Sequence, residues 1–365
     1  MDIVNIGIDL HKQQFTCYFL CKNEGKYFKY TTKKEGYDLF KKDLELIKEN
    51  GIKIRVAIES TGNTRYFKNE IEKLGIEVKI VNTLHFKVVN QTVNKTDKKD
   101  AKIIAEFLAK DIIPEVKLSS EKSEKLKRLL SSRDILVRTK VKLKNQIHGF
   151  LLSFGIDTRN GQLNSIKGRK AVIEQVNEAE NKRIIELIIG NIEILEKQIK
   201  EINNELERMC ENDRAVEILK TIPGTGNITA VTVRAYIDDI KRFKEYAKLS
   251  GYCGLVPYVS ASDEKVYYGS ITKRGPVELR TAIIQMVLGM IRCKEEKDNR
   301  FMIMYRNIKS RKGSGKALVA VARKFTKLIW TLLSKDTEFN NEKLKNNFEK
   351  KQLTADQFDS VEKVA

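Results

Sequence analysis

Residues 1–32 have the sequence MDIVNIGIDLHKQQFTCYFLCKNEGKYFKYTT, and this stretch decides the fold of the first third of the chain. Three runs within it are rich in β-branched and aromatic residues, namely Ile3–Leu10, Phe15–Cys21 and Lys26–Thr32. Short polar breaks that suit hairpins separate the runs. The pattern therefore predicts three consecutive strands joined as a meander.

Helical spacing and β-rich runs then alternate as far as residue 108. The helical patterns are Tyr37–Glu49, Tyr66–Leu74 and Asp97–Leu108, and the β-rich runs between them are Lys53–Glu59 and Glu77–Val81. A three-stranded meander followed by α-β-α-β-α is the element order of the ribonuclease H-like fold. We therefore expect an α/β domain of this class over residues 1–115.

Residues 116–213 have a different, purely helical pattern. Apolar residues step by three and four from Ile185 to Met209, as in a coiled-coil seam. A similar run over residues 121–150 is interrupted by charge and carries nine Lys or Arg against three acids, which predicts a basic solvent face. We expect two long helices joined by the stretch around residues 157–168. They could pack on each other or on a second subunit, and the sequence does not choose.

Residues 214–334 predict a third, mostly helical domain, and residues 335–365 a polar, frayed tail. The third domain opens with ILKTIPGTG at Ile218–Gly226, followed by a helical pattern at Ile228–Tyr236. A Gly-x-Gly turn before a helix resembles helix-hairpin-helix modules, in which backbone N–H groups face a phosphate.

The charge of the chain indicates its partner. Lys and Arg number 69 and Asp and Glu 49, so the net charge is +20 over 365 residues. Such an excess favours nucleic acid through phosphate neutralisation, although charge alone would also suit an anionic membrane. No secretory signal pattern opens the chain, no apolar run approaches the roughly 18 residues of a membrane span, and five scattered cysteines with three histidines suit neither disulfides nor zinc. We expect a cytoplasmic protein without a membrane partner.

Four carboxylates stand where the predicted fold would gather them. Asp9 and Glu59 end two predicted strands, and Asp97 and Asp100 share one face at the start of a helix. Such a cluster repels itself unless cations occupy it, and Mg²⁺ prefers oxygen ligands. Two ions about 3.5–4 Å apart would assist phosphoryl transfer. The alternative is that each acid only caps a helix or ends a strand in solvent.

A second group of polar residues lies in and around Gly251–Gly275. Ser250, Ser260 and Ser262 are expected at or within the first half of a loop, and a basic turn at Lys273 and Arg274 follows. A serine in such a loop can attack a phosphodiester and become linked to DNA, provided that something activates it. The alternative is a surface loop with turn-forming serines.

Two sets of motifs resemble a known family, the DEDD insertion-sequence transposases, which comprise the Piv-like and bridge-RNA-guided recombinases. The resemblance covers about residues 1–330. The first set is GIDLHK at Gly7–Lys12, AIESTGNTRY at Ala57–Tyr66 and KTDKKDAKIIAEFL at Lys95–Leu108. The second set is the segment Thr221–Pro257, GSITKRGPVELRTAI at Gly269–Ile283 and GKALVAVARKF at Gly315–Phe325.

The resemblance implies a RuvC-like first domain whose acidic tetrad binds divalent metal, two Mg²⁺ ions or alternatively Mn²⁺. The matching positions are Asp9, Glu59, Asp97 and Asp100. It also implies a serine that becomes covalently joined to DNA. The family's Ser-Ser-Gly-Gly-Lys falls on residues 261–265, which makes Ser262 the first choice and Ser260 the second. Here one serine is replaced by alanine and both glycines by acids, a departure that puts the activity of this copy in question.

The family's coiled-coil region is implicated in subunit pairing and in holding a guide RNA. We accordingly expect a homo-oligomer, a dimer or tetramer, with donor DNA, target DNA and a structured guide RNA as partners. The residues expected to contact nucleic acid are Arg133, Arg138, Lys142, Lys273 and Arg274. The resemblance predicts an RNA-guided DNA recombinase that acts through a serine adduct. The alternatives are a metal-dependent junction nuclease that hydrolyses DNA without an adduct, and a non-catalytic RNA-binding protein.

Overall fold

A computed structural model describes residues 2–82, 97–159, 161–262, 265–293 and 300–341. The chain divides into two compact units, Met1–Ser119 and Ser120–Ala365. The first is a mixed α/β unit and the second is mostly helical, as the sequence predicted. The expected boundary near residue 213 lies inside the second unit.

The first unit is built on a five-stranded sheet with the order β3-β2-β1-β4-β5. The strands β1, β2 and β3 form an antiparallel meander, whereas β4 runs parallel to β1 and β5 parallel to β4. All five predicted strands are confirmed, with ends within two residues of those expected. Their bounds are Ile3–Leu10, Gln14–Cys21, Glu24–Thr31, Lys53–Glu59 and Val78–Val81.

Helices cover both faces of this sheet. Helices α1 (Lys34–Glu49) and α2 (Thr64–Glu72) pack on one face, where the ring of Phe15 makes edge-to-face contacts with those of Phe40 and Phe67. Helix α4 (Asp97–Ala109) packs on the other face against β1 and β2. Side chains alternate along a strand, so alternate β1 residues serve the two faces.

Small residues allow α4 to approach β1 closely. A Cβ atom added to Gly7 would lie 2.1 Å from the carbonyl oxygen of Ala101 and 2.3 Å from the backbone nitrogen of Ala105. Glycine is therefore required at this position of β1. Ala101 and Ala105 are fully buried, and alanine at both positions keeps the helix near the sheet. The contact sets the position of α4 along β1.

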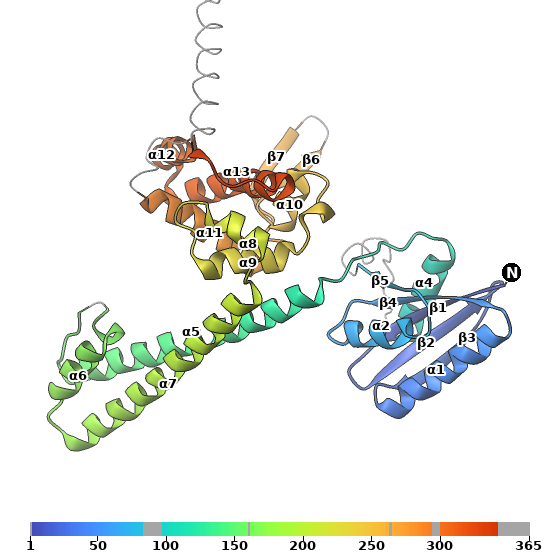
Figure 1. Cartoon of the computed structure of the whole chain (residues 1–365), viewed down its shortest axis with the longest axis horizontal. Coiled ribbons are helices and arrows are strands. Elements are labelled where there is room, and N and C mark those ends of the chain that lie inside the picture. Colours follow the sequence, from blue (N-terminus) through green and yellow to red (C-terminus); the bar gives the residue numbers. More distant parts are fainter. Residues whose placement is uncertain (1, 83–96, 160, 263–264, 294–299, 342–365) are drawn as a thin grey trace, which may run out of the picture. The chain divides into compact units, whose positions relative to one another are not determined.

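The second unit begins with a helical pair, α5 (Glu121–Ser153) and α7 (Ala179–Met209). These helices pack on each other in opposite directions, with α6 (Ile166–Glu174) at their far end (Figure 1). The apolar seam of α7 is confirmed, because most of its residues are buried. The two long predicted helices are confirmed too, and they pack together within one chain.

Helix α6 was missed by the sequence analysis, which treated this region as a connection. Ser165 caps it by accepting a hydrogen bond from the backbone of Gly168 at 3.1 Å. The buried Arg169 then binds Glu196 of α7 through two hydrogen bonds of 2.7 Å. Lys140 of α5 lies 3.5 Å from the same carboxylate. This ion cluster fastens α6 to the helical pair.

The remaining helices form one hydrophobic core to which the helical pair contributes. Leu126 and Leu130 of α5 and Leu206 of α7 belong to the same cluster as the residues of α9, α11 and α13. This shared core is the reason why the coiled coil and the C-terminal helices form one unit. The helix bounds are Arg214–Lys220 for α8, Asn227–Ile237 for α9, Tyr246–Tyr252 for α10, Val277–Arg292 for α11, Arg300–Lys312 for α12 and Ser314–Lys335 for α13.

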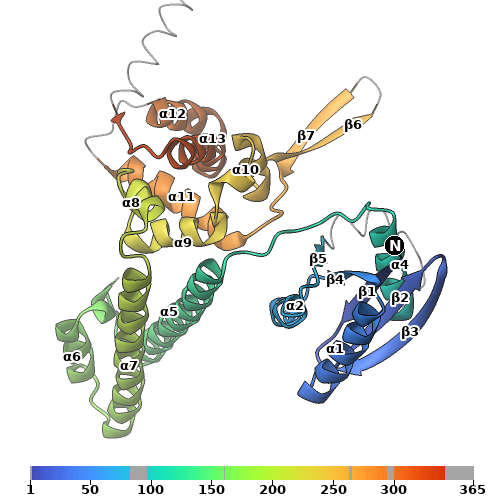
Figure 2. The ribbon, with the colours of Figure 1, turned by 45° about the vertical axis from the view of Figure 1, so that its right-hand side comes forward.

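The segment expected as a serine-bearing loop is instead a β-hairpin. Strands β6 (Pro257–Ser262) and β7 (Lys265–Ile271) pair antiparallel, with Ser260 opposite Tyr267 and Ser262 opposite Lys265. Figure 2 shows the hairpin extending away from the helices of its unit. Ser250 is not part of it, because this residue lies buried in α10 with its hydroxyl 2.5 Å from that of Thr326.

The start of the expected tail is ordered against the second unit. Arg214 of α8 pairs with Asp336 and Glu338, each at 3.0 Å. The backbone nitrogen of Phe339 donates to the hydroxyl of Thr221. The prediction of a frayed tail was therefore wrong for residues 336–339, whereas residues 342–365 lie outside the described residues. No helix in the described part of the chain is both long and apolar enough to span a membrane.

Candidate metal centre and serine hairpin

The parallel pairing of β1 with β4 places two of the predicted acids side by side. The register pairs Gly7 with Ala57 and Ile8 with Ile58, so Asp9 and Glu59 follow at the same level of neighbouring strands. Both belong to the sheet face that α4 covers, because Ile8 and Ile58 point to the opposite core. The carboxyl ends of the two strands therefore form one acidic edge.

Helix α4 adds a third acid to this edge. Asp97 stands one turn before Ala101, whose backbone packs on Gly7. The donor atoms of Asp9, Asp97 and His11 lie within 4.8 Å of one another. Glu59 and Asp100 are described residues but do not belong to this group of atoms. Asp100 is half-buried in the first turn of α4.

The structure adds His11, which was not among the predicted metal ligands, to this group. Its Nε2 atom lies 3.0 Å from Oδ2 of Asp9 and 3.5 Å from Oδ1 of Asp97. Asn63, in the turn between β4 and α2, donates to the carbonyl oxygen of His11 at 3.2 Å. Thr64 of α2 donates in turn to the carbonyl oxygen of Glu59. One turn therefore holds the ends of both strands. The position of His11, two residues past Asp9, was the sequence signal that could have identified it as part of this group.

Burial and repulsion act together on Asp9. The residue is 5% exposed. The pKa of its carboxyl is raised to about 6, chiefly by burial and also by the charges of Asp97 and Glu59, whereas His11 acts in the opposite direction. A carboxylate in this environment gains from a cation beside it, because a positive charge offsets both the desolvation and the repulsion. The chemistry of the donor set therefore fits a divalent metal ion.

The root of the serine hairpin is tightly constrained. A Cβ atom on Gly254 would lie 2.2 Å from the carbonyl oxygen of Arg274, and one on Gly275 would lie 2.0 Å from that of Tyr252. Arg280 of α11 donates to the carbonyl oxygens of Cys253 at 3.2 Å and Lys273 at 3.3 Å. The GLVP and ITKRG motifs thus meet at the base of the hairpin and orient it on the helical core.

The five basic residues expected to contact nucleic acid fall into two groups. Lys142, Lys273 and Arg274 are exposed, and Arg138 is exposed beside Asp134 at 2.8 Å. Arg133 is different, since it is half-buried and donates to Asn203 of α7 at 2.7 Å. Burial lowers the pKa of Arg133. Its side chain is engaged within the helical pair.

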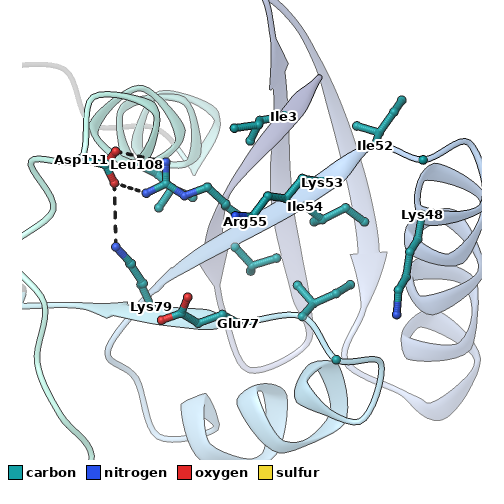
Figure 3. Close-up of a pocket in the computed structure, with 14 residues that line it drawn as sticks. Ile3, Lys48, Ile52, Lys53, Ile54, Arg55, Glu77, Lys79, Leu108 and Asp111 are labelled. Carbon is teal, nitrogen blue, oxygen red and sulfur yellow. Dashed lines mark hydrogen bonds and ion pairs between the residues drawn. The ribbon is translucent and has the colours of Figure 1, made fainter. Parts of the chain in front are cut away.

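A cavity of about 690 Å³ lies at the other end of the sheet from Asp9 and Glu59 (Figure 3). Its walls include Ile3 at the start of β1 and Lys53 at the start of β4. Figure 3 shows Arg55 and Lys79 reaching the same carboxylate, that of Asp111. Two of the cationic side chains that line the cavity are thus already paired with Asp111. None of the candidate metal ligands lines it.

Two family models match separate parts of the chain. A family model described as a transposase matches residues 6–156, which include the acidic edge and all of α5. A second model, described as the transposase IS116/IS110/IS902 family, matches residues 216–302, which include the serine hairpin. The chain is a DNA transposase. It belongs to the IS110 family of insertion-sequence transposases.

Named relatives extend the likeness over most of the chain. The transposase of insertion sequence element IS1111A from Coxiella burnetii is 27% identical over 287 residues, 78% of this chain and 79% of the relative. A probable family 20 transposase from Pseudomonas aeruginosa is 25% identical over 345 residues, 92% of this chain and 98% of the relative. The pilin gene-inverting protein of Moraxella bovis is 24% identical and covers 92% of this chain and 97% of its own length.

Proposed function

We propose that this chain is a site-specific DNA recombinase that moves its own insertion sequence, cleaving and rejoining DNA through a serine adduct under the guidance of a structured RNA. One observation carries the proposal. Two family models match the two halves of the chain, and each match contains one of the candidate sites, the acidic edge and the serine hairpin. A hydrolytic nuclease would need only the first of these.

The first unit is proposed to be a ribonuclease H-like, RuvC-like catalytic domain. The strand order β3-β2-β1-β4-β5 supports this assignment. The convergence of Asp9 and Asp97 at the carboxyl ends of the parallel strands β1 and β4 supports it too. Glu59 and Asp100 complete the proposed tetrad. When bound there, two divalent cations, Mg²⁺ or Mn²⁺, would polarise a backbone phosphate and stabilise the leaving oxygen.

The serine is proposed as the nucleophile. The Oγ atom of Ser262 attacks the phosphorus atom, its proton passes to solvent, and the bond from phosphorus to one sugar oxygen breaks as that oxygen leaves. The product is a phosphoserine ester, which a sugar hydroxyl of the exchanged strand later attacks to restore the phosphodiester and free the serine. Ser260 is the second candidate. Lys273 and Arg274, exposed at the root of the hairpin, would hold the phosphates.

The remaining partners are proposals of the same kind. Lys142 and Arg138 on the exposed side of α5 suit contacts to RNA phosphates, whereas the engagement of Arg133 with Asn203 makes its contact to RNA the weakest of the set. The acidic edge and the serine hairpin belong to different units. A composite site formed between subunits would bring them together, and it requires a homo-oligomer acting on donor and target DNA.

The experiment is to trap the adduct. Purified protein, the RNA encoded beside the element, and matched donor and target DNA are incubated with Mg²⁺ and quenched in denaturant. Protein-linked DNA is then sought by gel and located by peptide mass spectrometry. The variants Ser262→Ala and Ser260→Ala are run in parallel, together with Asp9→Asn.

The expected result is an adduct at Ser262 that requires both Asp9 and the cation. Cleaved DNA without an adduct, unaffected by either serine change, would instead identify a hydrolytic junction nuclease. If no protein cleaves DNA, and Asp9→Asn and a further variant, Asp97→Asn, bind RNA as the wild type does, the non-catalytic RNA-binding protein is the remaining alternative. Equal affinity of the protein for any RNA of similar length would refute guidance by a specific RNA, because nonspecific phosphate contacts would then explain the binding.

A further inference from the structure

His11 stands where a metal ligand would stand. Its Nε2 atom is 3.0 Å from one carboxylate oxygen of Asp9 and 3.5 Å from one of Asp97. Two ligand atoms about 2.1 Å from one ion stand about 3.0 Å apart at a right angle and about 3.4 Å apart at the tetrahedral angle. The two distances from His11 thus match those between ligands of a single ion, and the donor atoms of Asp9 and Asp97 lie within 4.8 Å of each other.

The surroundings hold His11 in this position. Its carbonyl oxygen accepts the hydrogen bond from Asn63, and its backbone nitrogen donates to the carbonyl oxygen of Gln14 at 3.0 Å. The turn after β1 is therefore fixed on both sides of the imidazole. Half of the His11 side chain is exposed, so an ion can reach the nitrogen from solvent.

Nitrogen and oxygen ligands select different cations. Mg²⁺ is a hard ion that takes oxygen ligands and gives up its water reluctantly. Imidazole nitrogens suit Zn²⁺, Fe²⁺ and Ni²⁺, which also accept carboxylate ligands, and Mn²⁺ has the lowest affinity of the first-row transition series for such sites. A ligand set of two carboxylates and one imidazole therefore disfavours Mg²⁺ relative to a set made of carboxylates alone.

We infer that His11 supplies a nitrogen ligand to a divalent transition-metal ion held by Asp9 and Asp97, so that this position of the site prefers such ions over Mg²⁺. The inference rests on the proposed function in one respect, because it assigns the cation of the same carboxylate site. It goes further in naming a ligand outside the acidic tetrad and the class of ion that this ligand selects.

The test uses the full chain without DNA or RNA. Mn²⁺ is the probe, since its unpaired electrons report bound nitrogen directly. Titration followed by EPR of free Mn²⁺ gives the affinity, competition with Mg²⁺ gives the preference, and pulsed EPR detects ¹⁴N coupling at the bound ion. The wild type is compared with His11→Ala, His11→Asn and His11→Asp. His148→Ala is the matched control, because this histidine contacts Thr158 in the second unit.

The wild type is expected to show ¹⁴N coupling that all three His11 variants lose and the control retains. Loss of the ligand should lower the affinity for Mn²⁺ by about tenfold or more. The affinity for Mg²⁺ should change less, and His11→Asp should shift the preference toward Mg²⁺. Circular dichroism checks that each variant is folded.

Two results would overturn the inference. One is the absence of ¹⁴N coupling in the wild type, and the other is an equal change in Mn²⁺ and Mg²⁺ affinity in every His11 variant, as expected if the imidazole only hydrogen-bonds to Asp9. Asp9→Asn separates this failure from that of the proposed function. If Asp9→Asn leaves the binding of both ions unchanged, the carboxylate site itself is wrong. If it abolishes binding while the His11 variants keep the preference, only the role of His11 falls.

Discussion

Replacement of Gly7 by alanine tests whether the contact between β1 and α4 builds the acidic edge. The new Cβ would lie 2.1 Å from the carbonyl oxygen of Ala101 and 2.3 Å from the nitrogen of Ala105. Both are backbone atoms, so no side-chain rotation relieves the clash. Helix α4 must withdraw by about 1 Å, and overpacking of this kind costs about 1–3 kcal/mol.

The displacement carries Asp97 away from Asp9, because Asp97 lies one turn before Ala101 on the same helix. A misplacement of about 1 Å at a catalytic centre can cost about 10²-fold in rate. We therefore expect Gly7→Ala to slow adduct formation by about two orders of magnitude. Amides of α4 should exchange with solvent about 5- to 150-fold faster, which is the equivalent of 1–3 kcal/mol.

Hydrogen exchange with mass spectrometry over residues 97–109 and a quenched time course of adduct formation measure the two effects. Gly62→Ala is the matched control, since a Cβ atom there has no neighbour within 4 Å. If Gly7→Ala behaves like this control in both assays, the proposed contact does not position α4. Faster exchange with unchanged adduct formation would mean that Asp97 does not depend on the contact.

Three further predictions concern the second unit. Glu196→Ala deprives the buried Arg169 of the carboxylate that accepts two of its hydrogen bonds and should lower the free energy of unfolding by about 3 kcal/mol, as measured by urea denaturation. Burial opposes the ionised form of Asp213, but hydrogen bonds and charges from Lys122 and Arg234 outweigh it and lower its pKa. The stability from this carboxylate is therefore present above its unfolded pKa of about 3.9 and is lost as the pH falls through the lower, folded pKa. Asp213→Asn should flatten the acid side of the stability profile below about pH 3.9. Arg280→Ala should free the root of the hairpin, speeding proteolysis near residues 257–271 and reducing the adduct while leaving Mn²⁺ binding unchanged; equal loss of Mn²⁺ binding would contradict the role given to Arg280.

Much of the first unit could be predicted because its elements carry strong local patterns. The run Lys53–Glu59 is a short β-rich segment between polar breaks, and its bounds in the structure are those predicted. Asp9 and Glu59 were recognisable as candidates because each ends such a strand. In a parallel pair the carboxyl ends meet, so the element order alone brought the two acids to one edge.

The errors occurred where backbone packing, side-chain pairing or strand pairing, rather than the local sequence pattern, decides the structure. The stretch around residues 157–168 was expected to be a connection, yet Gly168 lies in the first turn of α6. Glycine is required there because a Cβ atom would lie 1.9 Å from the carbonyl oxygen of Gln162. Arg133 belonged to a basic helix, yet Asn203, seventy residues later, takes its side chain. The serines were expected in a loop, and pairing with β7 makes that segment a strand.

For the first unit, the sequence by itself determined which elements form, in which order they follow, and which acids end the strands. These features depend on periodicity and on residues adjacent in the chain. Only the tertiary structure decided that α4 lies close enough to β1 to bring Asp97 beside Asp9, and that His11 stands between them. Those distances depend on the packing of Gly7 against Ala101, ninety-four positions apart, and no local pattern specifies such a contact.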